Sequence, residues 1–395
     1  MTVTGHRTTA WAEARALAHG SVAPVAAGEV ALDDACGAVV AADVLARGDL
    51  PGADTAAMDG WAVRGPAPWR VVGEVLAGAV PGPLDDGHAV TIATGAVLPP
   101  GADGVLRREW GVAAGPRLTP LPEAPEEVRS PGPVGIDVRR AGEECAAGDV
   151  VLPAGSPVTP AAVGLLAAAG LDEVAVRRVR ADVLVLGDEL VRQGPARPGR
   201  PRDALGPLLA AWLGELGVTV WPPRAVPDDA AALAAALAAG SGDVVVTTGS
   251  TARGPVDHLH DVLAAAGARW VVDGVAVRPG HPQVLAMLPD GRPVVGLPGN
   301  PLAAVSGVLT LLEPVVAGLL GLPPREPGRC VLAEPVPAGD DATRLVPLRD
   351  GRPMVFAGPA MLRGLATADA VAVIPPGGAA RSQTVECLSL PGTWR

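Results

Sequence analysis

The stretch from Val294 to Val305, VVGLPGNPLAAV, joins an apolar strand to an apolar helix through a Pro-Gly-Asn-Pro turn. Pro301 suits the first helical turn, where its missing N–H is not needed. Gly299 has no side chain, so the backbone there can come close to a ligand. A helix N-terminus behind such a turn presents free N–H groups and partial positive charge. The stretch therefore predicts either a plain strand-to-helix connection or a rigid cradle for an anion.

Strands and helices alternate around this stretch, from residue 177 to about residue 322. The strands are continuous apolar runs such as ADVLVLG (181–187) and DVVVTTG (243–249), and helical segments such as 204–216 lie between them. Continuous apolar strands that alternate with helices are typical of a parallel sheet with both faces covered. We therefore predict a doubly wound α/β domain in this part of the chain.

The sequence patterns outside this domain predict two small β domains and two helical segments. Between residues 66 and 132, short β-like runs are separated by Pro and Gly, which is typical of a small β domain. Residues 323–395 return to that pattern and predict a second β module. Residues 8–19 and 26–48 carry helical patterns near the start of the chain.

The overall composition excludes several classes of protein. The chain has 395 residues, 49% of them hydrophobic, and a formal net charge of -11. Nucleic-acid binding needs clustered positive charge, so we expect no nucleic-acid partner. We find no apolar run of membrane-spanning length and no signal-peptide core, and therefore expect a soluble cytoplasmic protein with no membrane partner. The cysteines lie far apart without a CxxC motif, which indicates neither a zinc site nor a disulfide framework.

Three segments of the α/β region end a strand with a polar turn. Ligands in open α/β sheets bind outside the carboxyl ends of the strands, so these turns predict a binding rim. Their glycines can bring backbone N–H groups to an anionic ligand. The three segments are VLGDEL (185–190), VTTGSTARGPVD (246–257) and GLPGNP (296–301).

Three acids, Glu189, Asp228 and Asp257, could point to this rim. Carboxylates beside an anion site are useful when a divalent cation bridges the two. Acids near helix starts also serve as caps, and Asp228 and Asp257 each stand near a helix start. The grouping of all three at one rim favours the cation site over three separate caps.

The sequence lacks the motifs that would indicate other catalytic functions. His258 and His260 would diverge by about 200° on a helix, so a shared zinc ion is not predicted. The chain contains no Gly-x-Ser-x-Gly, GxxxxGK[ST] or GxGxxG motif. Hydrolase, P-loop and dinucleotide-binding interpretations therefore lose their main evidence.

A series of motifs along nearly the whole chain resembles the molybdopterin molybdenumtransferase family, which includes MoeA and the gephyrin E domain. AMDGWAVR and PGNP are specific to that family in combination. In chain order, the motifs are DTAAMDGWAVRG (54–65), TGAVLPPGADGVL (94–106), RRAGEECAAGDVVLPAGSPVTPAAVGLLAAAGLDEVAV (139–176), LGDEL (186–190), VAVRPGHP (275–282) and GLPGNP (296–301).

The resemblance implies a multidomain fold of α/β and β parts. It implies an elongated first domain from residues 1–53 and 133–176, with a small β domain, 54–132, inserted between them. A doubly wound α/β molybdopterin-binding domain, 177–322, and a C-terminal β barrel, 323–395, would follow. The resemblance further implies a homodimer whose site lies between the α/β domain of one subunit and the β domain of the other. The expected reaction takes adenylylated molybdopterin and molybdate and, with Mg²⁺, releases AMP and the molybdenum cofactor. Molybdopterin adenylyltransferase would be the upstream partner.

The resemblance also implies roles for individual residues. Asp59 and Thr94 would come from the partner subunit, and Glu189, Asp228 and Asp257 would be the rim carboxylates that hold Mg²⁺. Arg278 and His281 would stand where the family has two basic residues that meet the oxyanion. The pterin and its phosphate would lie against the two glycine-containing loops, at Gly249, Ser250, Pro298, Gly299, Asn300 and Pro301.

Several positions depart from the family pattern at the expected molybdate corner. Gly274 replaces a Lys, His281 replaces the second basic residue, and Ala303 and Pro359 each replace a Ser. Arg278 keeps its charge and a planar fork for oxyanions. Two interpretations follow: an active molybdenumtransferase with a rebuilt oxyanion site, or a divergent paralogue that binds molybdopterin or acts as a scaffold. The sequence does not choose between molybdate and tungstate, nor show whether a more typical second copy exists.

Overall fold

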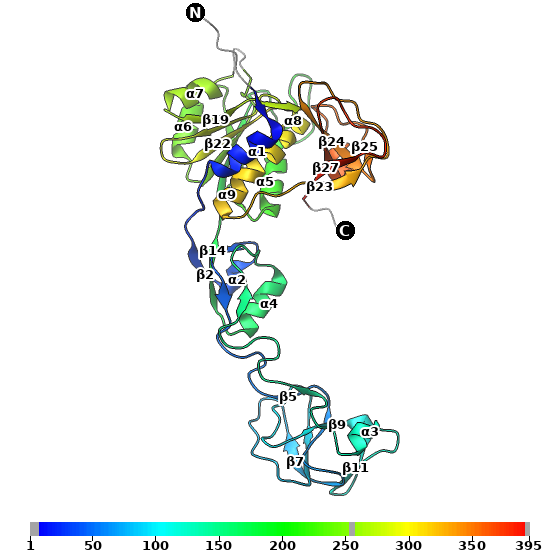
Figure 1. Ribbon diagram of the computed structural model, residues 1–395. Coiled ribbons are helices and arrows are strands. Elements are labelled where there is room, and N and C mark those ends of the chain that lie inside the picture. The colour runs from blue at the N-terminus through cyan, green and yellow to red at the C-terminus, as the bar shows by residue number, and fades with distance from the viewer. Residues whose placement is uncertain (1–7, 253–256, 392–395) are drawn as a thin grey trace, which may run out of the picture. The chain divides into compact units, whose positions relative to one another are not determined.

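The computed structural model describes residues 8–252 and 257–391. The chain divides into two compact units, and each is described here by itself (Figure 1). Unit 1 comprises residues 1–29, 37–41 and 175–395, and unit 2 comprises residues 30–36 and 42–174. Both units therefore contain segments that are far apart in the sequence.

A seven-stranded sheet forms the centre of the α/β part of unit 1. The strand order is β16-β15-β18-β22-β21-β19, and β17 also pairs with β15. Strands β15 to β18 and β22 pair in parallel, whereas β21 is antiparallel to both β22 and β19. The predicted parallel sheet is thus a mixed sheet with a parallel core. The strands are β15 (Arg180–Leu186), β16 (Thr219–Val220), β17 (Arg224–Val226), β18 (Val244–Thr248), β19 (Arg269–Asp273), β21 (Val284–Met287) and β22 (Pro293–Leu297).

Helices cover both faces of this sheet, as the sequence predicted. Successive side chains of a strand point to opposite faces. Val183 and Val185 of β15 accordingly join one buried cluster with α5, α8 and α9, and Leu184 and Leu186 join another with α6 and α7. The helices are α5 (Leu205–Glu215), α6 (Ala230–Ala239), α7 (Leu259–Ala265), α8 (Pro301–Gly307) and α9 (Glu313–Leu320), with the π-helical turn η2 (Val308–Leu312) between the last two.

The continuous helix from Pro301 to Leu320 corrects one expectation. We expected no apolar segment of membrane-spanning length, but these 20 residues are long and apolar enough to cross a membrane. The helix is the core helix of unit 1, since 94% of its apolar window is buried inside the protein. Its hydrophobicity is therefore explained by packing against the sheet and the neighbouring helices.

The first helix, α1 (Trp11–Gly20), lies in unit 1. Trp11 and Ala14 are buried in the same cluster as Leu319 of α9. The Trp11 Nε1 donates a hydrogen bond of 3.2 Å to Thr310 Oγ1. An apolar helix face with its own partner on α9 explains this placement.

The C-terminal part of unit 1 is a seven-stranded sheet with the order β1-β20-β24-β26-β27-β23, in which β25 also pairs with β24. Two of its strands, β1 and β20, come from outside the predicted module of residues 323–395. Within the described residues no ladder joins the outer strands β1 and β23, so the sheet is open where we expected a barrel. Its elements are β1 (Thr9–Ala10), β20 (Val275–Arg278), β23 (Gly328–Val331), β24 (Thr343–Arg349), β25 (Arg352–Pro353), η3 (Leu365–Thr367), β26 (Ala370–Ile374) and β27 (Thr384–Ser389).

Unit 2 contains a six-stranded sheet with the order β10-β11-β7-β8-β6-β9, together with smaller sheets. This sheet accounts for the Pro- and Gly-punctuated runs that predicted a β domain. Its strands are β6 (Gly60–Val63), β7 (Trp69–Val75), β8 (His88–Ile92), β9 (Gly104–Arg107), β10 (Gly111–Ala114) and β11 (Arg117–Pro120), with η1 (Arg108–Trp110) and α3 (Glu126–Arg129) beside them in sequence. The remaining elements are β4 (Val44–Leu45) paired with β13 (Val150–Leu152), β5 (Thr55–Ala56) paired with β12 (Val138–Arg139), and α4 (Pro160–Ala168).

The helix expected over residues 26–48 is wrong, because only α2 (Leu32–Ala35) is helical there. Gly37 follows it with a φ of 82°, which ends the helix. The β-branched Val39 and Val40 then form β3 (Val39–Val40), which pairs with β14 (Glu173–Arg177). On its other side β14 neighbours β2 (Gly28–Ala31).

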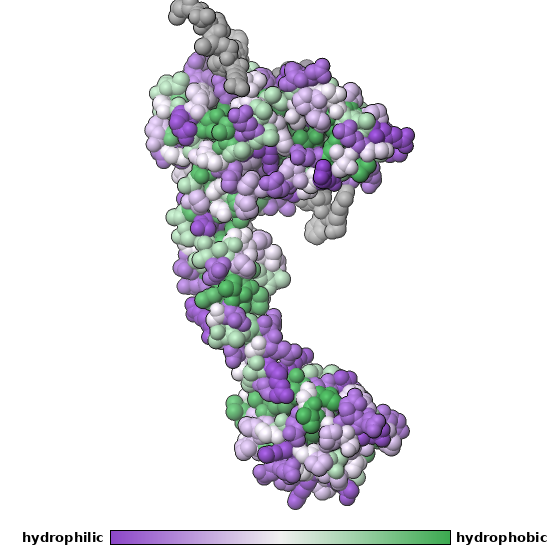
Figure 2. All heavy atoms as spheres, viewed as in Figure 1, coloured by the Kyte–Doolittle hydropathy of each residue, from purple (hydrophilic) through white to green (hydrophobic). Residues whose placement is uncertain are grey.

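On the face that Figure 2 shows, hydrophobic and hydrophilic residues are interspersed over both units. The exposed apolar side chains include Val80, which is 92% exposed, and Val355, which is 70% exposed. Single exposed apolar residues are ordinary on protein surfaces, so they indicate no particular function.

Candidate functional site

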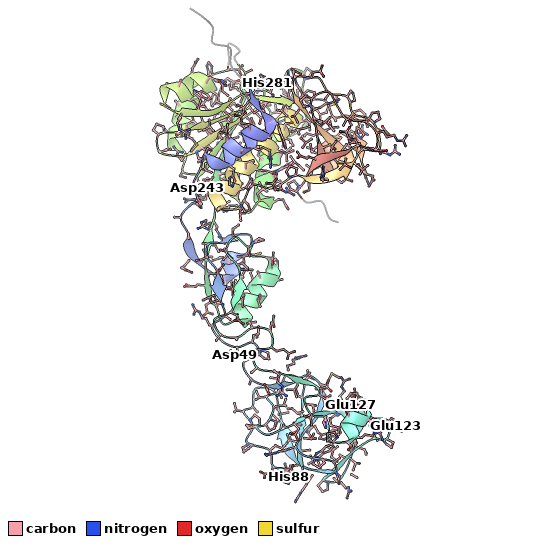
Figure 3. The ribbon with its side chains drawn as sticks, viewed as in Figure 1. Asp49, His88, Glu123, Glu127, Asp243 and His281 are labelled. Atoms are coloured by element: carbon pink, nitrogen blue, oxygen red, sulfur yellow. The ribbon has the colours of Figure 1, made fainter. Side chains whose placement is uncertain are left out.

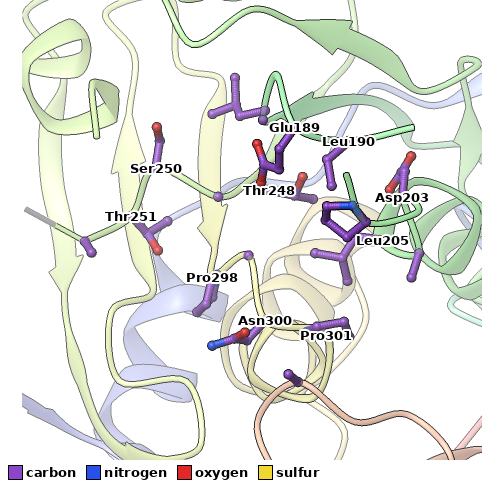
Figure 4. A pocket seen from close by; sticks show the side chains of 18 of the residues that line it. Glu189, Leu190, Asp203, Leu205, Thr248, Ser250, Thr251, Pro298, Asn300 and Pro301 are labelled. Atoms are coloured by element: carbon purple, nitrogen blue, oxygen red, sulfur yellow. The ribbon is translucent and has the colours of Figure 1, made fainter. Parts of the chain in front are cut away.

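Three neighbouring parallel strands, β15, β18 and β22, end at one pocket of about 800 Å³ in unit 1. The carboxyl ends of adjacent parallel strands meet at one edge of a sheet, which explains why loops far apart in the sequence converge there. In Figure 4, Glu189, Ser250 and Asn300 lie around the same opening on three different loops. Of the residues predicted from sequence, the pocket is lined by Glu189, Asp228, Gly249, Ser250, Asp257, Pro298, Gly299, Asn300 and Pro301.

The turn after β15 places the Glu189 carboxylate over Gly187. A Cβ added to Gly187 would lie 2.8 Å from Glu189 Oε2, and Gly187 has a φ of 126°. Only glycine tolerates both the conformation and the contact. The Gly-Asp-Glu sequence therefore sets the position of this carboxylate at the pocket.

Asp228 and Asp229 have separate roles at the start of α6. Asp229 is the N-cap, because its Oδ1 accepts a hydrogen bond of 2.8 Å from the Ala232 N–H. The Asp228 Oδ2 instead accepts a hydrogen bond of 3.0 Å from the N–H of Asp188, in the turn that carries Glu189. The helix-cap interpretation of Asp228 is therefore wrong, and its carboxylate belongs to the pocket.

The loop after β18 has an unusual backbone conformation. Gly249 and Ser250 both have positive φ, 83° and 55°. A left-handed conformation is uncommon for serine and is often found at functional sites. The Gly249 N–H donates a hydrogen bond of 2.9 Å to the carbonyl of Leu297, which fixes this loop to the end of β22.

The N-terminus of α8 differs from the expectation of free N–H groups. The N–H groups of Leu302 and Ala303 both donate to the carbonyl oxygen of Pro359, at 2.9 and 3.2 Å. Asn300, the N-cap residue, makes no side-chain cap. The carbonyl of Pro359 therefore serves as the cap, and its loop also contributes Ala360 and Leu362 to the pocket.

Two charged residues of the pocket were not predicted from sequence. Arg202 and Asp203 line it from the segment that precedes α5. Asp203 is 6% exposed, and its Oδ1 accepts a hydrogen bond of 2.9 Å from the Gly206 N–H. An acid directly before a predicted helix is a cap signal that could have identified Asp203, but no sequence pattern marks Arg202.

The two basic residues of the expected molybdate corner lie outside the pocket in unit 1. Arg278 and His281 are not among the described residues that line the pocket. Arg278 Nη2 lies 3.6 Å from Asp341 Oδ2, in a hollow of about 330 Å³ that Arg344 also lines. Arg278 lies opposite Arg344 in the pairing of β20 with β24. The charge that sequence comparison assigns to the oxyanion is thus paired with Asp341.

Gly274 lies beside His281, whose position is labelled in Figure 3. The Nδ1 of His281 donates a hydrogen bond of 2.9 Å to the Val275 carbonyl. Gly274 has a φ of 88°, a conformation that disfavours lysine and every other residue with a Cβ. This conformation gives a physical reason for glycine at a position where the family pattern has Lys.

Asp59 and Thr94 lie together in unit 2. The Thr94 N–H and hydroxyl donate to Asp59 Oδ1 at 2.7 and 2.8 Å. These two hydrogen bonds, the backbone one first, hold the pKa of the Asp59 carboxyl below its ordinary value. An ionised acid is therefore maintained on an exposed loop.

The described residues hold no preformed cluster of metal-binding side chains. Within residues 8–252 and 257–391, no group of three or more His, Cys, Asp and Glu side chains is arranged to hold a metal ion. The His258–x–His260 pair does not change this, since His260 Nε2 lies 2.9 Å from Asp273 Oδ1. The pocket carboxylates nevertheless supply the oxygen donors that Mg²⁺ prefers, and Mg²⁺ usually takes one or two of them together with substrate phosphates and water.

Comparison with known families defines the class of protein. Residues 9–170 match the MoeA N-terminal region (domain I and II), and residues 182–318 match a probable molybdopterin binding domain. A molybdopterin molybdenumtransferase 2 of Mycobacterium tuberculosis is 34% identical over 321 residues, which cover 76% of this chain and 77% of the relative. A molybdopterin molybdenumtransferase of Staphylococcus aureus is 31% identical over 307 residues, 74% of this chain and 71% of the relative.

The solved structures agree with this classification. The molybdopterin biosynthesis MoeA protein from Pyrococcus horikoshii is similar over 98% of this chain and 100% of that chain, with a TM-score of 0.77 and 26% identity. The chain belongs to the molybdopterin molybdenumtransferase family.

Proposed function

We propose that this chain inserts molybdenum from molybdate into adenylylated molybdopterin and releases AMP. The observation that carries the proposal is the pocket at the ends of β15, β18 and β22. It brings together the Gly-Asp-Glu turn, the Gly249–Ser250 loop and the Pro-Gly-Asn-Pro turn. Relatives with 31–34% identity over most of the chain are named molybdopterin molybdenumtransferases, so the alternative of a binding or scaffold protein is not favoured.

The pocket residues fit the chemistry of this reaction. Release of AMP breaks the phosphoanhydride bond of the substrate, and the oxygen of a water molecule replaces the AMP oxygen on the pterin phosphate. Asp228 and Asp257 can orient that oxygen nucleophile and accept its proton. The glycine-containing loops allow the backbone to approach the phosphates closely.

Mg²⁺ is part of this proposal. Glu189, Asp228 and Asp257 would hold it together with phosphate oxygens, and it would neutralise the charge that develops on the phosphate oxygens during AMP release. Since the three acids do not form a complete site by themselves, the substrate would complete the coordination.

We further propose a cytoplasmic homodimer in which Asp59 and Thr94 of one protomer complete the site of the other. The resemblance of the MDG and TGAVLP motifs to the family supports this assignment. The adenylylated substrate would come from a molybdopterin adenylyltransferase.

The function is tested by mixing the purified protein with adenylylated molybdopterin, Mg²⁺ and molybdate. We expect formation of the molybdenum cofactor and AMP in equal amounts, and Asp257→Ala should reduce the rate ten- to a thousandfold. An Arg278→Ala variant tests the rebuilt oxyanion corner, because it removes the exposed guanidinium paired with Asp341. Tight pterin binding without molybdate-dependent turnover would contradict the proposed activity.

A further inference from the structure

The pocket is lined mainly by negatively charged side chains, and the three loop motifs that form it contribute no positively charged side chain to its described lining. Four carboxylates line it, those of Glu189, Asp203, Asp228 and Asp257. Among the described lining residues, Arg202 carries the one guanidinium. A phosphate group beside several carboxylates meets like-charge repulsion unless a cation compensates it. Mg²⁺ would supply part of that compensation, and Arg202 is placed to supply more.

Hydrogen bonds on both sides fix the backbone of Arg202. The N–H of Val191 donates to the carbonyl of Pro201 at 2.9 Å, and the N–H of Asp203 donates to the carbonyl of Val191 at 3.0 Å. The Asp203 carboxylate in turn caps α5 through the Gly206 N–H. The backbone on both sides of Arg202 is therefore bonded to Val191, and Asp203 is also bonded to the start of α5.

The side chain of Arg202 is held loosely. Its Nη1 lies 3.5 Å from the carbonyl of Gly194, at the limit of a hydrogen bond. Within the described residues, Arg202 has no carboxylate within 4.0 Å in a salt bridge. An exposed guanidinium without an ion-pair partner keeps its planar fork of N–H donors for an oxyanion.

Two other arginines of the same segment are already engaged with backbone groups. Arg192 Nη1 donates to the Pro223 carbonyl at 2.9 Å, and Arg200 Nη2 donates to the Asp188 carbonyl at 3.1 Å. Neither arginine lines the pocket. Arg192 is thus a matched control, because it carries the same charge, is likewise exposed and belongs to the same segment.

From this arrangement we infer that Arg202 binds the diphosphate of the adenylylated substrate, an inference that rests on the proposed function of the pocket. A guanidinium can donate two parallel hydrogen bonds to neighbouring phosphate oxygens. Arg202 is a binding residue in this role. It would contact the negatively charged phosphate oxygens, whereas Glu189 would contact the positively charged Mg²⁺. The inference assigns the positive charge of the pocket to a residue of the segment between β15 and α5.

The experiment is a calorimetric titration of the full chain with inorganic pyrophosphate in the presence of Mg²⁺. We expect Arg202→Ala to raise the Kd about tenfold or more. Arg202→Lys should recover part of the affinity, because it keeps the charge but loses the fork. Arg192→Ala should bind as the wild type does. Titration with inorganic phosphate distinguishes the two phosphate sources, since a diphosphate site should bind the single phosphate much more weakly.

Three results would overturn the assignment. They are an unchanged Kd for Arg202→Ala, an equal loss for Arg192→Ala, and a wild-type protein that forms cofactor but does not bind pyrophosphate. The proposed function fails separately: wild-type protein that binds pyrophosphate through Arg202, yet forms no cofactor from the complete substrates, leaves this assignment standing. In the turnover assay, Arg202→Ala should raise KM for the adenylylated substrate more than it lowers kcat.

Discussion

Asp228 and Asp229 are adjacent in the chain, and their side chains serve different needs. Asp229 satisfies the N–H of Ala232 at the start of α6, whereas Asp228 bonds the N–H of Asp188 at the pocket. Sequence alone could not assign the two, because either acid can cap a helix. The hydrogen bonds therefore assign a role in folding to Asp229 and a role at the pocket to Asp228.

We expect the two acids to give opposite phenotypes. Asp229→Ala should lower the free energy of unfolding by about 1 kcal/mol, because a helix N-cap is lost, and should leave AMP release unchanged. Asp228→Ala should slow AMP release ten- to a thousandfold with little change in stability. Urea unfolding and the AMP assay on both variants measure this. Equal losses of activity in the two variants would contradict the separation of roles.

Gly274 gives a second prediction at the residue scale. A Cβ added there would make only ordinary contacts, the nearest at 3.6 Å from His281 Cε1. The φ of 88° alone should make Gly274→Ala less stable by about 1 to 2 kcal/mol. Gly164, inside α4 with no atom within 4 Å of an added Cβ, is the control. Gly164→Ala should stabilise by about 1 kcal/mol in the same urea experiment, and a destabilised Gly164→Ala would undermine the comparison.

At the scale of elements, sequence patterns located the loops of the pocket but not all of its charges. The alternation of strands and helices places the ends of β15, β18 and β22 at one edge, so Glu189 and Asn300 could be predicted to meet. Arg202 could not, because its segment between β15 and α5 has no periodicity. The pairing of Arg278 with Asp341 also escaped prediction, since it depends on β20 joining β24 in the C-terminal sheet.

Helix α9 begins with a buried acid, Glu313, which is 5% exposed. Its Oε1 accepts a hydrogen bond of 3.0 Å from Trp212 Nε1, while its Oε2 is buried without a hydrogen-bond partner. Burial raises the pKa of this carboxyl above its ordinary value of 4.5. The hydrogen bond from Trp212 and the positive charges of Arg325 and Arg15 lower the pKa, but their effect is smaller than that of burial. The folded protein therefore holds a proton here that the unfolded chain releases more easily.

The consequence is a pH-dependent stability. Between the unfolded pKa near 4.5 and the raised folded pKa, the folded state binds more protons, so the free energy of unfolding should fall as the pH rises through this interval. Glu313→Gln keeps the acceptor for Trp212 and removes the titration, so the variant should lose less stability than the wild type. Urea unfolding of both proteins from pH 4 to pH 8 checks this. Parallel pH profiles would show that Glu313 does not contribute.

At the scale of the whole molecule, the proposed homodimer makes a quantitative prediction. Asp59→Asn in unit 2 and Asp257→Asn in unit 1 should each abolish most activity. If each site takes Asp59 from one protomer and Asp257 from the other, unfolding and refolding an equal mixture should give hybrids with one intact site. About one quarter of the wild-type activity should return, since about half of the dimers are hybrids with one working site of two. If a mixture that is shown to contain hybrid dimers recovers no activity, this result would contradict a shared site.

The hydrogen-bonded contact between the Pro359 carbonyl and the N–H groups of Leu302 and Ala303 has a consequence for the exchange of domains between relatives. It links the segment between β25 and η3 to the first turn of the core helix, beside the pocket. Thermodynamic linkage is reciprocal, so a ligand that binds more tightly while this contact is intact must strengthen the contact by the same factor. For such a ligand, exchanging the C-terminal module with that of a relative would alter the affinity of a pocket to which the module contributes only Ala360 and Leu362 among the described residues.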